Sequence, residues 1–268
     1  MARLHCTLIQ ADLIWENKEA NLQKLESMIA GIVGAKELVI LPEMFNTGFS
    51  LRPELLGETM EGPSVSWMKQ IAQQYRIILV GSLMITESGK HYNRLIWMQP
   101  DGRYAQYDKR HRFAYSGENE HFTAGDYRLI TQANGFKILW QVCYDLRFPV
   151  WARQQSSETP EYDVLVYVAN WPESRSHAWK SLLIARAIEN QCYVIGVNRV
   201  GEDGNGIAHS GDSMVVDPLG QVLLQLSNAE AFETVAISKQ ELEEVRTRFP
   251  FWKDADSFTI LQSNDLDE

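Results

Sequence analysis

Two continuous apolar runs separated by one helical segment place the strongest constraint on the fold. The runs are DVLVYVAN at 163–170 and CYVIGVN at 192–198. Apolar runs without polar alternation are typical of strands that are buried on both faces of a sheet. Between them, residues 176–190 place Trp179, Leu183 and Ala187 on one side of a helix. A buried strand, a helix and a second buried strand predict a layered α/β fold.

Strands and helices alternate along the rest of the chain as well. A hairpin within 209–226 is expected to turn at Asp217–Gly220. Asn17 and Ser238 are suited to cap helices, and the first of these helices should end at Gly34. Strands outnumber helices and helices come between strands, so two sheets with helices outside them are the expected layering. The further strands are predicted at 3–10, 37–41, 77–84, 93–99, 103–109, 127–131 and 136–142, and the further helices at 62–75 and 238–249.

The length and composition fit one large domain. The chain has 268 residues, 45% of them hydrophobic, which is enough for a sizeable core. No linker, repeat or low-complexity stretch interrupts the sequence. We therefore expect a single domain over 1–268, whose last ~15 residues, acidic after Trp252, form a tail.

Charge and cysteine content narrow the class of protein. The net charge of −10, without basic runs, argues against binding to nucleic acid or to an anionic membrane. No apolar segment approaches the ~18 residues of a membrane helix, and the first residues do not form a signal peptide. Three cysteines without a CxxC pair argue against a disulfide framework. A cytoplasmic protein that acts on a small molecule is the expectation.

Three predicted strands end at residues that can do chemistry. Glu43 follows the strand at 37–41, Lys109 ends the strand at 103–109, and Cys143 follows the strand at 136–142. A strand end is where a rigid scaffold presents side chains to a pocket. The segment after Cys143, YDLRFPVWARQ, predicts a turn into a helix, whose N-terminus would favour a thiolate. Glu43 is suited to take the thiol proton, and Lys109 to stabilise charge on a substrate oxygen.

Each of these residues also has an ordinary structural explanation. A cysteine flanked by apolar residues is more often part of the core, which is our interpretation of Cys6 and Cys192. Glu43 and Lys109, taken singly, would fit solvated loop residues. Their complementary chemistry favours a reactive site over a catalytically silent binding module.

A metal-dependent phosphoesterase on a similar sandwich is the alternative from another class. It would need clustered acids and histidines. The six histidines form no HExxH motif and no close cluster with cysteines, so neither a metal nor a cofactor is expected. His111, two residues after Lys109, is interpreted as a surface residue.

Three motifs carry a resemblance to a known family. LVILPEMFNTGF, YDKRHRF and QVCYDLRFP resemble the signatures of the nitrilase, or carbon–nitrogen hydrolase, superfamily. The resemblance extends from the first strand to GDSMVVDPLG and keeps the order Glu, Lys, Cys. It implies a four-layer α-β-β-α sandwich and a homodimer. By position, Glu43 corresponds to the general base, Lys109 to the transition-state stabiliser and Cys143 to the nucleophile.

The resemblance also implies a second glutamate and a substrate class. The family places this glutamate shortly before a PGD-like turn. ENEHFTAGD supplies Glu120 there, with Glu118 as a neighbour and Ala124 in place of proline. The segment 169–201 resembles the small ω-amidases, which hydrolyse the terminal amide of 2-oxoglutaramate, 2-oxosuccinamate and similar 2-oxo acid amides. A nitrilase, a carbamoylase and an amidase of deamidated glutathione stay open as alternatives.

Such a substrate carries a carboxylate far from the amide, and arginine binds carboxylates in a bidentate fork. Arg147 and Arg175 are the candidates, with a structural salt bridge to Asp145 or Glu43 as the alternative for Arg147. The backbone N–H of Tyr144 is the expected second donor to the oxyanion. The candidate pocket walls, which could equally be core residues, are Phe49, Phe113, Tyr144 and Trp171.

Overall fold

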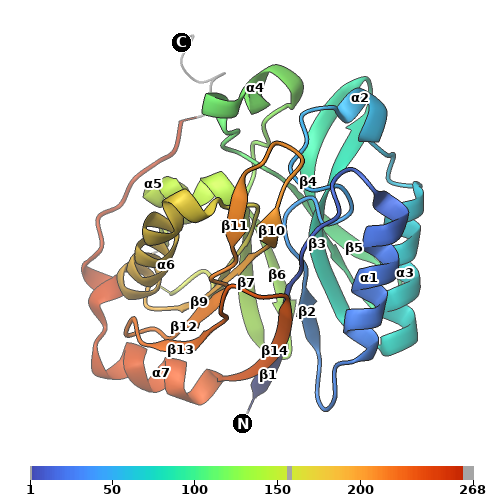
Figure 1. Cartoon of the computed structure of the whole chain (residues 1–268). Helices are drawn as coiled ribbons and strands as arrows, with labels where there is room; N and C mark the ends of the chain where they lie inside the picture. Colours follow the sequence, from blue (N-terminus) through green and yellow to red (C-terminus); the bar gives the residue numbers. More distant parts are fainter. Residues whose placement is uncertain (1, 156–158, 262–268) are drawn as a thin grey trace.

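Two six-stranded sheets form the centre of the molecule (Figure 1). The computed structural model describes residues 2–155 and 159–261. The first sheet has the order β14 (Ala231–Ser238), β1 (Arg3–Gln10), β2 (Leu38–Ile40), β3 (Ile78–Glu87), β4 (Lys90–Met98) and β5 (Tyr104–Asp108). The second has the order β13 (Val222–Gln225), β12 (Met214–Val216), β9 (Tyr193–Asn198), β8 (Val164–Ala169), β7 (Phe136–Val142) and β6 (Leu129–Ala133).

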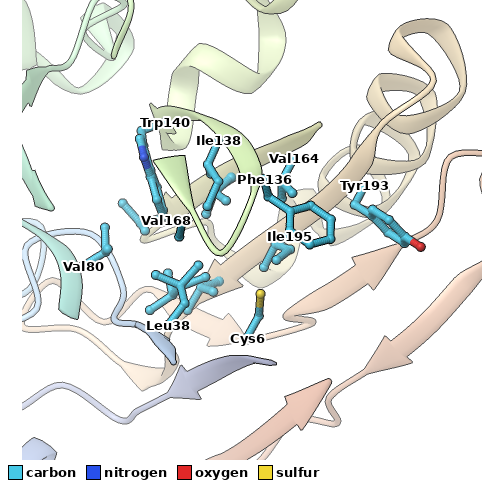
Figure 2. Close-up of a cluster of buried hydrophobic side chains, with 14 of the residues drawn as sticks. Cys6, Leu38, Val80, Phe136, Ile138, Trp140, Val164, Val168, Tyr193 and Ile195 are labelled. Carbon is cyan, nitrogen blue, oxygen red and sulfur yellow. The ribbon is translucent and has the colours of Figure 1, made fainter. Parts of the chain in front are cut away.

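The two sheets pack face to face through one apolar core. Alternate residues of each strand point to the same side of a sheet, so every strand contributes a row of side chains to this layer. Figure 2 shows Cys6, Leu38 and Val80 from the first sheet in one cluster with Phe136 and Ile195 from the second. Removal of this apolar surface from water holds the sheets together.

Helices cover the outer faces of both sheets (Figure 1). α1 (Lys18–Ala30) and α3 (Pro63–Tyr75) pack on the first sheet, where Ile29 and Met68 share a cluster with Leu79. α6 (Ser176–Asn190) packs on the second through Trp179 and Leu183. The layers therefore run helix, sheet, sheet, helix, which confirms the predicted four-layer α-β-β-α sandwich.

The directions of the central strands determine where polar side chains collect. β1, β2 and β3 are parallel, and so are β7, β8 and β9. β5 runs in the same direction as β3, because β4 is antiparallel to both. The carboxyl ends of parallel strands meet at one edge of a sheet, which is where ligand sites form in α/β folds.

Short elements complete the structure. They are α2 (Pro53–Leu56), η1 (Ala114–Ser116), α4 (Glu118–His121), η2 (Cys143–Arg147), α5 (Pro149–Ala152), η3 (Glu173–Arg175), the ribbon of β10 (Val200–Glu202) and β11 (Ala208–Ser210), α7 (Lys239–Arg248) and η4 (Phe251–Asp254). Across 2–155 and 159–261, no helix is both long and apolar enough to cross a membrane.

Helix caps and one hairpin form as the sequence predicts, whereas the end of α1 and strand β14 differ. The side chains of Asn17 and Ser238 cap α1 and α7, as predicted. The hairpin of β12 and β13 closes where the Gly220 N–H donates to the Asp217 carbonyl. The predicted end of α1 was wrong: the helix stops at Ala30, because the Ile32 N–H donates to the Ile29 carbonyl three residues back and the four-residue pattern ends there. β14 was not predicted.

The tail is only partly covered by the structure. Residues 255–261 form no helix or strand, and Ile260 packs against the core between the sheets. The rest of the predicted tail, 262–268, lies outside the described residues. The division into one domain and a tail stays a prediction.

Candidate active site

Three strand ends bring Glu43, Lys109 and Cys143 together. Glu43 lies shortly after β2, and Lys109 and Cys143 directly follow β5 and β7. The Lys109 Nζ lies 2.9 Å from Glu43 Oε1. Cys143 lines the same cavity as Glu43 and Lys109, and the charges of both side chains act on the pKa of its thiol in opposite directions. The first sheet therefore supplies an acid and an amine, and the second sheet supplies the thiol.

Glu43 is fully buried and held by three donors. Its Oε1 accepts from the Lys109 ammonium and, at 2.8 Å, from Asn93 Nδ2. Its Oε2 accepts from the backbone N–H of Asn170 at 2.8 Å. Asn170 Nδ2 also donates to the Glu43 carbonyl at 2.5 Å, which ties the ends of β2 and β8 together. The carboxylate is thus fixed in position along the cavity that Cys143 also lines.

The second carboxylate on Lys109 is Glu118, and the prediction of Glu120 was wrong on this point. The Lys109 Nζ lies 3.0 and 2.9 Å from the two oxygens of Glu118, which is fully buried at the start of α4. Glu120 is exposed. Residues two apart on a helix point in different directions, so only one of the two can face inward.

Burial and charge act in opposite directions on these groups. Burial lowers the pKa of Lys109, but the carboxylates of Glu118 and Glu43 outweigh it and hold the pKa above its ordinary value. Burial raises the pKa of Glu118, the Lys109 charge opposes the rise, and the Glu43 charge adds to it. Lys109 therefore stays protonated between the two carboxylates.

The pKa of the Cys143 thiol is raised well above its ordinary value. Burial is the main cause and the charge of Glu43 adds to it, while Lys109 and the Asn170 N–H oppose it. The expected help from a helix N-terminus was wrong, since Cys143 lies in η2 and α5 is a four-residue helix that begins only at Pro149. The thiol is neutral at rest and needs a base.

Asp145 fastens the turn of Cys143 to the strand of Lys109. One carboxylate oxygen accepts from Tyr107 OH at 2.7 Å and from the Val142 N–H at 3.0 Å. The other contacts the His111 N–H at 2.9 Å and His111 Nδ1 at 2.8 Å. Asp145 is fully buried, and Cys143 itself adopts a positive φ of 44°. His111 is thus half-buried in a network beside the site, and our surface interpretation of it was wrong.

A cavity of about 590 Å³ opens onto Glu43, Lys109 and Cys143. Its walls include all six residues predicted to contact substrate, namely Phe49, Phe113, Tyr144, Arg147, Trp171 and Arg175. The volume lies in the range typical of small-molecule sites.

Two arginines of the cavity lie over aromatic rings. The Arg147 guanidinium is 4.8 Å from the Trp171 ring centroid, and that of Arg175 is 5.3 Å from the Phe113 centroid. In 2–155 and 159–261 neither guanidinium pairs with an acid, so the salt bridge considered for Arg147 does not form there. Arg52, a third arginine of the cavity, is paired with Glu16.

Comparison with known proteins identifies the family. The Carbon-nitrogen hydrolase family model matches residues 6–247. The chain belongs to the carbon–nitrogen hydrolase family. This confirms the family that the motifs predicted and makes the protein a hydrolase of carbon–nitrogen bonds.

The relatives of this carbon–nitrogen hydrolase span nearly its whole length. It is 43% identical to Omega-amidase YafV of Escherichia coli (strain K12), with 97% of this chain and 100% of the relative aligned. It is 34% identical to a 2-oxoglutaramate amidase of Bacillus subtilis (strain 168), over 92% of this chain and 95% of the relative. It also resembles the solved structure of XC1258 from Xanthomonas campestris, a CN-hydrolase superfamily protein with an arsenic adduct in the active site. The TM-score is 0.95 at 41% identity, covering 97% of this chain and 100% of that one.

Sequence analysis missed two polar residues of the site, Asn93 and Asn170. Asn93 lies in β4 with Leu95 and Trp97 on the same side of the strand, and both of those side chains belong to the core between the sheets. A polar residue at a core-facing position of a strand was the available signal. Asn170 directly follows β8, as Cys143 follows β7.

A metal-dependent phosphoesterase would need acids and histidines clustered around a metal ion. Among the residues described, no group of three or more His, Cys, Asp or Glu side chains is placed to hold a metal ion. Family membership now replaces the phosphoesterase alternative.

Proposed function

We propose that the protein is an ω-amidase that hydrolyses the terminal amide of 2-oxo acid amides such as 2-oxoglutaramate and 2-oxosuccinamate. The observation that carries this proposal is the meeting of Glu43, Lys109 and Cys143 in a cavity that also holds two arginines without an acidic partner among the described residues. The Escherichia coli and Bacillus subtilis relatives, an ω-amidase and a 2-oxoglutaramate amidase by name, support the same substrate class.

The first half of the reaction forms a thioester. Glu43 takes the thiol proton as Cys143 Sγ bonds to the amide carbon, and the carbonyl electron pair moves onto oxygen. The raised pKa of the thiol favours this coupled transfer over a preformed thiolate. When the tetrahedral intermediate collapses, the carbon–nitrogen bond breaks, and Glu43 returns its proton to nitrogen so that ammonia leaves.

The second half releases the acid. Glu43 deprotonates a water molecule, whose oxygen bonds to the thioester carbon. The carbon–sulfur bond then breaks, and the proton on Glu43 returns to Cys143. The same carboxylate serves as base and acid in both halves, which its fixed position between thiol and ammonium allows.

Lys109 and the backbone N–H of Tyr144 are the proposed donors to the oxyanion. Lys109 is buried and protonated, so its charge is little screened by water. Glu118 holds the ammonium in place through both of its oxygens.

The carboxylate of the substrate is proposed to bind Arg147 or Arg175. Both guanidinium groups line the cavity and lack an acidic partner in the described chain. The carboxylate of a bound substrate would supply that partner. Phe49, Phe113, Tyr144 and Trp171 would form the walls around the carbon chain. The family resemblance also leads us to propose a homodimer, and the cytoplasmic setting stays a prediction.

The direct test is mass spectrometry of the protein mixed with 2-oxoglutaramate. We expect an acyl adduct on Cys143 and release of ammonia, both abolished by thiol alkylation and unaffected by EDTA. A substrate panel with a nitrile, an N-carbamoyl amino acid and deamidated glutathione should give slower ammonia release. Faster turnover of any of these three would overturn the assigned substrate class.

A further inference from the structure

Asn93 contacts both carboxylates of the site without adding charge. Its side chain is 1% exposed on β4. Its Nδ2 donates to Glu43 Oε1 at 2.8 Å and to Glu118 Oε1 at 3.3 Å. Its backbone carbonyl accepts from the backbone N–H of Lys109 at 2.9 Å. One residue is therefore bonded to Glu43, Glu118 and Lys109.

The two oxygens of Glu43 are occupied unequally. Oε1 accepts from Lys109 Nζ and from Asn93 Nδ2, which fills the two lone-pair sites of a carboxylate oxygen. Oε2 accepts one backbone bond, from the Asn170 N–H, and keeps one site free. A proton from the thiol can therefore be received at Oε2.

We propose that Asn93 is a positioning residue that fills Glu43 Oε1 and so directs the Cys143 proton to Oε2, while its second bond opposes protonation of the Glu118 carboxylate. The inference rests on the proposed function for the role of Glu43 as base. Asn93 acts through Glu43 and Glu118, and it does not line the cavity.

The charge balance of the site explains why a neutral donor is needed here. The titratable groups that face Glu43 are Lys109 from the end of β5, Glu118 from α4 and Cys143 from η2. Two carboxylates share one ammonium, and burial raises the pKa of Glu118. Hydrogen bonds to the ionised form of a carboxylate oppose protonation. The Asn93 amide provides two such bonds, and its buried Oδ1 has no hydrogen-bond partner in the part of the chain that the structure describes. The Asn93 side chain therefore contacts the site only as a hydrogen-bond donor, through its Nδ2.

The test measures the pH dependence of Cys143 alkylation by iodoacetamide in Asn93→Ala and Asn93→Asp. Cys6 and Cys192 are fully buried, so alkylation of the folded protein, mapped by mass spectrometry, reports on Cys143. Loss of the Asn93 donors makes the site take up a proton more readily. The acid limb of the rate profile should move to higher pH by about one unit in Asn93→Ala. It should move further in Asn93→Asp, which adds a third carboxylate.

Asn46→Ala is the matched control. Asn46 is 2% exposed and donates to Ser64 Oγ at 2.9 Å and to the buried carboxylate of Glu58 at 3.4 Å. Like that of Asn93, its Oδ1 has no hydrogen-bond partner among the described residues. Its replacement should lower stability much as Asn93→Ala does and leave the acid limb in place.

An acid limb that stays at the wild-type pH in both Asn93 variants would overturn the inference, as would an equal shift in Asn46→Ala. If Asn93→Ala does not fold, the isosteric Asn93→Asp decides. Alkylation requires no amide substrate, so failure of the substrate assignment and failure of this inference give different results.

Discussion

Lys109 and Glu118 form a two-point contact, with the Nζ 3.0 and 2.9 Å from the two carboxylate oxygens. Both side chains are buried, so the ion pair is shielded from water and salt. Glu43 holds the same ammonium from another side. Lys109 is therefore fixed between two acids before any substrate arrives.

This contact predicts different effects for two neighbouring glutamates. Glu118→Gln removes a charge-assisted bond and leaves the ammonium less well oriented, so we expect kcat to fall roughly 10- to 100-fold. Glu120→Gln changes an exposed side chain and should alter kcat less than about twofold. Steady-state ammonia release measures both. Equal losses in the two variants would contradict the assignment of Glu118.

Asp145→Asn should destabilise the protein. The Asp145 carboxylate contacts Tyr107, Val142 and His111, and an amide offers only one accepting oxygen. Because the residue is fully buried, the free energy of unfolding should fall by about 2–4 kcal/mol. Urea unfolding checks this, with the exposed Asp256→Asn as control. An unchanged unfolding midpoint in Asp145→Asn would show that these bonds do not hold the turn.

His209 predicts a loss of stability in acid. Burial lowers its pKa from 6.5 to about 4, with help from the Arg199 charge. Between these values the unfolded chain binds a proton that the folded protein does not, so stability falls as pH drops from 6.5 to 4, by up to about 3 kcal/mol.

Unfolding free energies measured across this range should show a flatter pH dependence in His209→Gln than in the wild type. The exposed His177→Gln serves as the control and should keep the wild-type slope. A wild-type slope in His209→Gln would assign the acid sensitivity to other groups.

Arg147→Ala and Arg175→Ala test the carboxylate anchor. Replacement of the anchoring arginine should raise KM for 2-oxoglutaramate roughly 10- to 100-fold, because a charge-assisted pair is lost. KM for a short neutral amide should change less than about threefold, since that substrate has no carboxylate to bind. If each variant raises KM equally for both substrates, the arginines shape the cavity and do not anchor the carboxylate.

The catalytic residues that follow strands could be predicted from the sequence, whereas the residues that hold them in place could not. Apolar runs mark buried strands, and the polar residue after each run falls at a sheet edge, which located Glu43, Lys109 and Cys143. Periodicity also located the main helices. β14 was missed although it pairs with the full length of β1, because its residues are mostly half-buried and show no clear apolar pattern.

The choice between Glu118 and Glu120 depended on information that spacing does not hold. Both lie in a four-residue helix, too short for a hydrophobic face to show which side is inward. The thiol pKa was likewise misjudged, because strand and turn assignments do not reveal the depth of burial that raises it. Asn93 was overlooked because its role comes from contacts with Glu43 and Glu118, 50 and 25 residues away.

The distribution of the site over two sheets has a further consequence. Glu43 and Lys109 are carried by one sheet, and Cys143 by the other. An expanded form of the chain that kept both sheets but lost their docking would retain its far-ultraviolet circular dichroism, yet its thiol would sit out of reach of its base. Separation of the two sheets would therefore abolish turnover before the secondary structure is lost.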